Sequence, residues 1–96
     1  MKIPKKIKMF GYDWKVIMSE RDGDAGYYWE KLEIHLCKRY AEEQLIHEIF
    51  EATLVHLQFR YRGVEGGMEY KFIFDHTGLC QFHKILYQTL KDNKLI

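Results

Sequence analysis

The sequence predicts an α+β fold in which a small sheet, built from N-terminal antiparallel β-hairpins, packs against two helices. Apolar and polar side chains alternate over residues 1–20 and again over 27–37, which is typical of strands with one buried face. Apolar residues then recur at helical spacing over 41–60 and 75–93. Strands in the first half of a chain and helices in the second indicate the α+β class.

Composition favours one globular domain spanning residues 1–96. Hydrophobic residues make up 47% of the chain and aromatic residues 16%, which is enough for a packed core. The net charge of +1 lacks the basic excess of most polyanion-binding proteins, so nucleic acid is not the expected partner. The sequence does not indicate an oligomeric state.

The chain carries no sequence sign of export or membrane insertion. No stretch approaches the ~20 apolar residues of a membrane span, and the N-terminus lacks the apolar run of a secretory signal. Cys37 and Cys80 form no C-x-x-C motif, and two such thiols are typical of a reducing compartment. We therefore expect a cytoplasmic protein with no membrane partner, in which both cysteines are at least half-buried.

Residues 1–20 predict a first β-hairpin with its turn at residues 11–13. The side chains expected on its inner side are Ile3, Ile7, Met9, Trp14, Val16 and Met18. Lysines gather near its start: Lys2, Lys5, Lys6 and Lys8. Such lysines could touch a phosphate backbone, but edge strands commonly carry lysine to block edge pairing, and we prefer that explanation.

Residues 27–30 and 32–37 predict a second pair of strands after a turn-rich loop. The acids of that loop lack the remaining ligand positions of an EF-hand, so calcium is not expected. In the later strand, Leu32, Ile34 and Leu36 should face inward, and Glu33, His35 and Cys37 should lie on the other face. If this strand borders a cleft, its backbone could pair with an extended peptide.

The C-terminal part predicts an interrupted segment and a second helix. Over residues 61–74 we expect a short strand or an ordered loop, broken by Gly63, Gly66 and Gly67. Asp75 can cap a helix that ends near residues 91–93. Its apolar stripe consists of Leu79, Phe82, Leu86 and Leu90.

The helix predicted over 41–60 carries polar side chains among its apolar ones, which are Leu45, Ile46, Ile49, Phe50, Leu54 and Leu57. His47 and Glu51 are four residues apart, so at about 3.6 residues per turn they lie on one side, where both can reach a single ion. Glu48 points toward the rim of the same site. Imidazole and carboxylate are both zinc ligands, so the pattern indicates a metal site.

This stretch resembles the H-E-x-x-H helix of zincin metallopeptidases, in which two histidines hold zinc and the glutamate activates water. Here Glu51 stands in place of the second histidine, so a ligand set of two histidines and one glutamate needs a histidine from elsewhere. His56 follows His47 by nine residues and falls on the opposite face of the helix. His76 and His83 share one face of the second helix, and periodicity leaves both open.

A second resemblance covers most of the chain. The segments H-E-I-F-E-A (47–52), D-H (75–76) and L-Y-Q-x-L-K-D-N (86–93) are similar to small metallopeptidases encoded by phages and other mobile elements. In that pattern the histidine that opens the last helix accompanies the metal-binding helix, which implies His76 in preference to His83. The resemblance further implies a zincin-like minimal domain, with the last two ligand types of the minimal gluzincins exchanged.

The resemblance implies a zinc-dependent metallopeptidase that acts on a peptide or protein substrate. Zn²⁺ would be held by His47, Glu51 and His76, with Glu48 as general base toward metal-activated water. The alternative is a catalytically inactive metal-binding domain that mediates a protein or nucleic-acid interaction. The same side chains could also form a hydrogen-bonded cluster without an ion. Stacking of nucleic acid on the aromatic residues of the hairpins is less economical than cross-strand packing.

Overall fold

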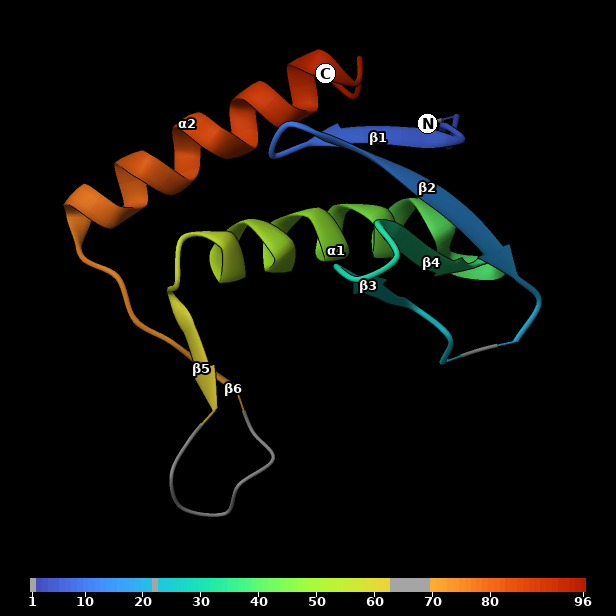
Figure 1. Cartoon of the computed structure of the whole chain (residues 1–96), viewed down its shortest axis with the longest axis horizontal. Helices are drawn as coiled ribbons and strands as arrows, with labels where there is room; N and C mark the ends of the chain where they lie inside the picture. Colours follow the sequence, from blue (N-terminus) through green and yellow to red (C-terminus); the bar gives the residue numbers. More distant parts are fainter. Residues whose placement is uncertain (1, 22, 63–69) are drawn as a thin grey trace.

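The computed structural model describes residues 2–21, 23–62 and 70–96. In these residues a four-stranded mixed sheet is followed by two long helices, so the α+β prediction is confirmed (Figure 1). The elements in chain order are β1 (Lys6–Met9), β2 (Tyr12–Ser19), β3 (Gly26–Tyr28), β4 (Glu33–Cys37), a 3₁₀ turn (Lys38–Tyr40), α1 (Ala41–His56), β5 (Arg60–Arg62), β6 (Tyr70–Phe72) and α2 (His76–Asp92).

The first hairpin turns one residue earlier than the sequence suggested. Met9 pairs with Tyr12, so the turn consists of Phe10 and Gly11. Both have positive φ angles, 58° and 83°, which is the signature of the type I′ turn that suits two-residue hairpins. The Phe10 ring stacks on His56 at a centroid distance of 4.2 Å, which connects the turn to the end of α1.

The sheet has the strand order β1-β2-β4-β3. β4 therefore lies between β2 and β3, parallel to β2 and antiparallel to β3. The two antiparallel pairs agree with the predicted hairpins, whereas the parallel pairing that joins them was not predicted. Local alternation of side chains fixes which face of a strand is buried, but it does not specify which strand becomes its neighbour.

The core lies between the inner face of the sheet and α1. Its buried side chains are Ile7, Met9, Trp14, Ile34, Leu36, Ala41, Leu45, Ile49 and Ala52. α2 packs against α1 and β1 (Figure 1). The prediction was wrong for two core residues. Met18 is 43% exposed near the C-terminal end of β2, beyond the part that pairs with β1, and Phe50 faces α2 at the surface.

α1 ends at His56 and not near Arg60 as predicted. Gln58 adopts a positive φ of 63°. Its amide donates to the Val55 carbonyl at 2.9 Å, and the Phe59 amide donates to the Leu54 carbonyl at 2.8 Å. This is a Schellman motif, which closes the helix and turns the chain toward β5. The apolar spacing continues past His56, so a prediction from periodicity alone made the helix too long.

The predicted cap of α2 is confirmed, because the Asp75 carboxylate accepts a hydrogen bond from the Gly78 amide at 2.8 Å. β6 provides the short strand expected after residue 61, while the three glycines lie outside the described residues. Leu79 is 45% exposed and so departs from the predicted apolar stripe. Cys37 is buried as expected, but Cys80 is exposed, because it lies on the face of α2 that points away from α1.

The end of α2 is fastened to β1. The Asn93 side chain accepts from the Lys8 amide at 2.7 Å and donates to the Lys8 carbonyl at 2.8 Å. One amide side chain thus pairs with both backbone groups of one strand residue. Neither described helix is long and apolar enough to cross a membrane.

Candidate metal centre

α1 presents one buried face to the sheet, and Glu48 lies on that face. The buried positions Ala41, Leu45, Ile49 and Ala52 recur at helical spacing. Glu48 is only 6% exposed. Its burial follows from its position one residue before Ile49, on the margin of the apolar face.

The donor atoms of His47, Glu48 and Glu51 lie within 4.8 Å of one another. Nε2 of His47 is 2.9 Å from Oε2 of Glu51. The His47 side chain is 67% exposed and that of Glu51 is 22% exposed. The histidine therefore lies at the surface, and the Glu51 carboxylate is largely shielded from solvent. The prediction that His47 and Glu51 share one side of the helix, one turn apart, is confirmed.

The group fits a divalent metal ion by its chemistry and spacing. Zinc binds imidazole nitrogen and carboxylate oxygen at about 2.0–2.2 Å, so two tetrahedral donors lie roughly 3.4 Å apart. The His47 to Glu51 separation of 2.9 Å would need to open by about half an ångström. Nitrogen and oxygen donors also suit other divalent ions, so the group could hold a metal ion whose identity its ligands do not specify.

A pocket of about 480 Å³ opens beside this group and gives small molecules access to it. It is lined by Ala25, Tyr40, Glu43, Gln44, His47 and Glu48. Sequence reasoning did not single out Tyr40 or Gln44. Helical spacing could have found Gln44, which precedes His47 by three residues and Glu48 by four. Ala25 could not have been found, because it reaches the pocket through the path of the loop between β2 and β3.

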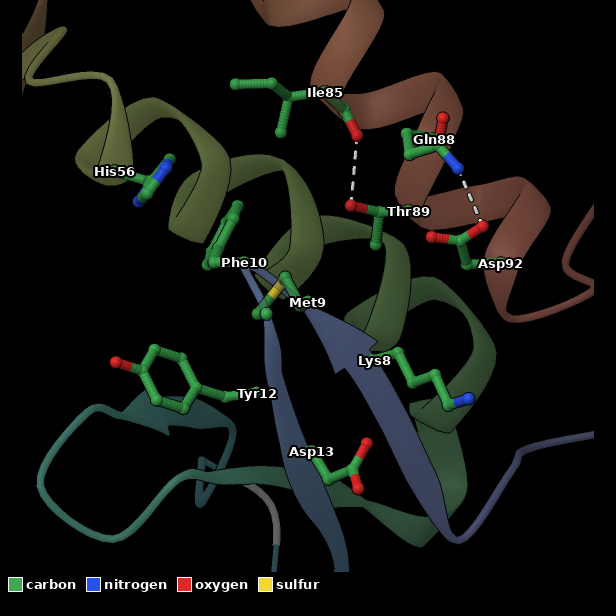
Figure 2. A pocket seen from close by; sticks show the side chains of 11 residues that line it. Lys8, Met9, Phe10, Tyr12, Asp13, His56, Ile85, Gln88, Thr89 and Asp92 are labelled. Carbon is green, nitrogen blue, oxygen red and sulfur yellow. Dashed lines mark hydrogen bonds between the residues drawn. The ribbon is translucent and has the colours of Figure 1, made fainter.

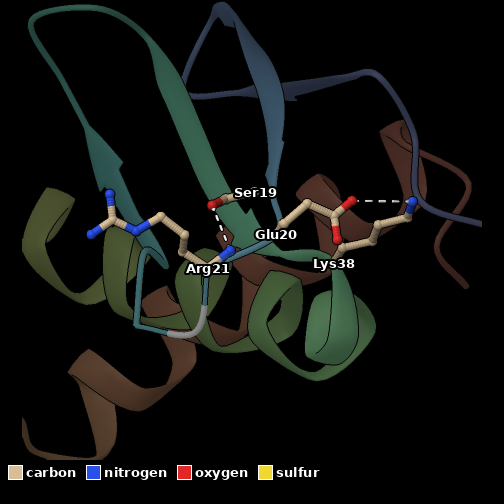
Figure 3. A network of polar contacts seen from close by, with 4 residues as sticks. All are labelled: Ser19, Glu20, Arg21 and Lys38. Atoms are coloured by element: carbon tan, nitrogen blue, oxygen red, sulfur yellow. Dashed lines mark hydrogen bonds and ion pairs between the residues drawn. The ribbon is translucent and has the colours of Figure 1, made fainter.

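Hydrogen bonds hold that loop in place. The Ser19 hydroxyl donates to the Asp24 carboxylate at 2.7 Å and accepts from the Arg21 amide at 3.1 Å. Figure 3 shows this turn beside an ion pair of 3.4 Å between Glu20 and Lys38. That pair is well exposed and contributes little energy.

His76 lies outside the group of three. It is the first residue of α2 and is exposed. The rings of Phe50 and Phe82 are in contact, with centroids 5.7 Å apart, and the two helices run in roughly opposite directions (Figure 1). His76 lies about 9 Å beyond Phe82 along α2, while His47 lies on the other side of Phe50 along α1, so the displacements add. The assignment of His76 as third ligand stays a prediction.

The remaining histidines also lie elsewhere. His83 stacks on Tyr87 with centroids 6.2 Å apart. His35 is half-buried on the outer face of the sheet, with Nε2 2.9 Å from a carboxylate oxygen of Glu33. His56, at the end of α1, stacks on Phe10.

His56 borders a second pocket, of about 430 Å³, between the first hairpin and α2 (Figure 2). The polar side chains on its α2 wall are already bonded: Gln88 donates to Asp92 at 2.7 Å, and the Thr89 hydroxyl donates to the Ile85 carbonyl at 3.0 Å. This pocket contains no member of the group on α1. We therefore place the candidate site at the pocket of about 480 Å³ beside His47 and Glu48.

Comparison of the chain with protein-family models, curated proteins and solved structures found no match. The zincin-like assignment accordingly rests on the sequence pattern. What the structure adds is the spatial group of His47, Glu48 and Glu51, which is able to hold a metal ion.

Proposed function

We propose that this chain is a zinc-dependent hydrolase that cleaves peptide bonds. The observation that supports the proposal most directly is the convergence of His47, Glu48 and Glu51 on one turn of α1, beside an open pocket. His47 and Glu51 hold the ion, and Glu48 serves as general base. Among the described residues, Glu48 supplies the third donor atom of this group, and His76 is not part of it.

The protein's own residues divide the work. Zinc, when bound, would polarise a carbonyl group and lower the pKa of a coordinated water. His47 and Glu51 fix the position of the ion from the rigid helix. Glu48, buried at the margin of the pocket, would take a proton from water and deliver it to the leaving amine. Its burial limits the directions from which solvent can reach the carboxylate.

The decisive experiment replaces Glu48 by Gln, which keeps the size of the side chain and removes its basicity. Metal content and folding should stay close to native, while metal-dependent cleavage of a peptide library should fall about 10²- to 10⁴-fold. His56→Ala, at the far end of the same helix, should leave both metal content and cleavage unchanged. Equal cleavage by native and Glu48→Gln protein at equal metal occupancy would contradict the assigned role.

Two further results have distinct meanings. If Glu48→Gln loses the metal, Glu48 is a ligand and not the general base. If native protein binds zinc but cleaves no peptide in broad substrate pools, the inactive metal-binding domain replaces the hydrolase. Protein for these assays should be free of a metal-affinity tag.

The third ligand is tested separately by zinc content in a Cys80→Ser background, which removes the exposed thiol of α2. The resemblance predicts that His76→Ala lowers zinc bound to the α1 group and that His83→Ala does not. If the zinc content of His76→Ala protein is unchanged, His76 is not a ligand, and all protein ligands of the ion come from α1.

A further inference from the structure

The face of α2 that points away from α1 carries an unusual row of side chains: His76, Cys80, His83 and Tyr87. All of them are exposed, whereas Gly78 and Thr89 on the opposite face are buried. The row advances by four, three and four residues, which is the spacing of a seam between two packed helices. An exposed helix face is ordinarily rich in charged residues, so this row is a candidate contact surface.

Within the row, His76 and Cys80 already lie close to a chelating arrangement. Nδ1 of His76 is 3.9 Å from Sγ of Cys80, one helical turn away. Zinc binds thiolate sulfur at about 2.3 Å and imidazole nitrogen at about 2.0–2.1 Å, so tetrahedral sulfur and nitrogen donors lie roughly 3.6 Å apart. The pair therefore needs a movement of only a few tenths of an ångström to bind one ion.

α2 offers this ion two donors and cannot supply the rest. His83 is seven residues from His76, which places the two about 10 Å apart along the helix axis, too far to meet at one ion beside Cys80. A closed zinc site has four ligands. A second copy of the chain, placed with its α2 across a two-fold axis, provides the missing histidine and cysteine in the same geometry.

We propose that His76 and Cys80 form half of a zinc site that a second copy of this chain completes, making the exposed row of α2 a metal-dependent dimer interface. The ion offsets the repulsion between Lys84 and Lys91, which flank the row, and their counterparts in the second copy. The site shares no residue with the group on α1 and stands without the proposed hydrolase activity. In this proposal His76 binds the same ion as Cys80, so it competes with the assignment of His76 as third ligand of the α1 site.

Cobalt(II) tests this site selectively, because a cobalt–thiolate bond gives an intense near-ultraviolet charge-transfer band that nitrogen and oxygen ligands do not give. The group on α1 contains no sulfur, and the only other thiol of the chain, Cys37, is buried. Under a non-thiol reductant, native protein and Cys37→Ala protein should show the band. Cys80→Ser protein should lack it, and a band that survives this substitution would overturn the proposal.

The dimer is tested by sedimentation of the untagged chain, with and without Zn²⁺, in a His47→Ala, Glu51→Ala background that disables the group on α1. We expect monomers without zinc, and dimers holding one zinc per two chains with it. Both Cys80→Ser and His76→Ala should remain monomeric, and His83→Ala should still dimerise. Monomers holding one cobalt each with a thiolate band, or loss of dimers in His83→Ala but not in His76→Ala, would refute the site as assigned.

Discussion

Gln58 and Lys94 hold the left-handed position after the two long helices, with φ angles of 63° and 55°. In this region an ordinary side chain costs roughly 1–2 kcal/mol, because its Cβ crowds the following carbonyl. Glycine avoids that cost, which is why it predominates at such positions. The two helix ends are therefore places where the sequence departs from the best local choice.

Replacing Gln58 by Gly should stabilise the protein by about 0.5–1 kcal/mol, since relief of the backbone strain exceeds the added freedom of the unfolded chain. Urea unfolding measures the change. Gln81→Gly is the matched control, because Gln81 is exposed in the interior of α2, where glycine should cost about 0.5 kcal/mol. Destabilisation by both substitutions would mean that the Gln58 side chain makes contacts that outweigh its strain.

Glu33 gives the protein a predictable response to acid. The hydrogen bond with His35 lowers the pKa of Glu33 below its ordinary value of 4.5, helped by the nearby Lys31 and Lys15 charges and opposed by partial desolvation. A carboxyl group with a lowered folded-state pKa stabilises the protein above its unfolded pKa and loses that effect as the pH falls through the folded value.

Urea midpoints measured from about pH 6 down to pH 3 should therefore fall less steeply in Glu33→Gln protein than in native protein. Glu30→Gln, an exposed acid in the turn before β4, controls for the loss of one surface charge. Parallel curves for native and Glu33→Gln protein would show that the contact with His35 does not influence folding.

Residues that belong to one element were predictable, because helical spacing is local. His47 and Glu51 needed only the 3.6-residue repeat to be placed together, and they are together. The position of His76 relative to them depends on how α2 packs across α1, which no local repeat encodes. The exposure of Cys80 was missed for the same reason.

At the scale of elements, the contact between α2 and β1 depends on Asn93. Asn93→Ala removes both bonds to the Lys8 backbone and should destabilise the protein by about 1–2 kcal/mol. Amide exchange at Lys8 should also become faster, which reports the loosened junction directly. Gln88→Ala is the control, because the Gln88 amide donates to Asp92 within α2, away from β1, and its loss should change stability by less than about 0.5 kcal/mol.

Strands and helices were largely identified from sequence, whereas their neighbours were not. Alternation placed Ile7, Trp14 and Ile34 in the core, as observed. The parallel pairing of β2 with β4 joins residues about 18 positions apart, such as Val16 and Ile34, across a connection that contains β3, and local alternation does not specify such a pairing. α1 ends earlier than predicted because Gln58 adopts a left-handed backbone conformation, which glutamine rarely adopts and which its residue type therefore does not predict.

At the scale of the whole molecule, metal bound to the group on α1 should raise thermal stability, because an ion that binds only the folded chain stabilises it by mass action. Zinc at 100 times its Kd contributes about 2.7 kcal/mol, or roughly 10–20 °C in Tm for a domain of this size. Chelation in a Cys80→Ser background should reverse the gain. His47→Ala, Glu51→Ala protein should not respond, and an unchanged Tm of Cys80→Ser protein on chelation would mean that the site is too weak to matter.

The position of β4 between β2 and β3 governs the order in which a growing chain can fold. β1 and β2 can pair as soon as they are made, but in the described sheet β3 bonds only to β4 and must wait for it. After β4 come the 3₁₀ turn and then α1, whose apolar face needs the finished sheet for burial. We therefore expect the turn of α1 that carries His47, Glu48 and Glu51 to become ordered only after the sheet has formed, so that the three side chains come together late in folding.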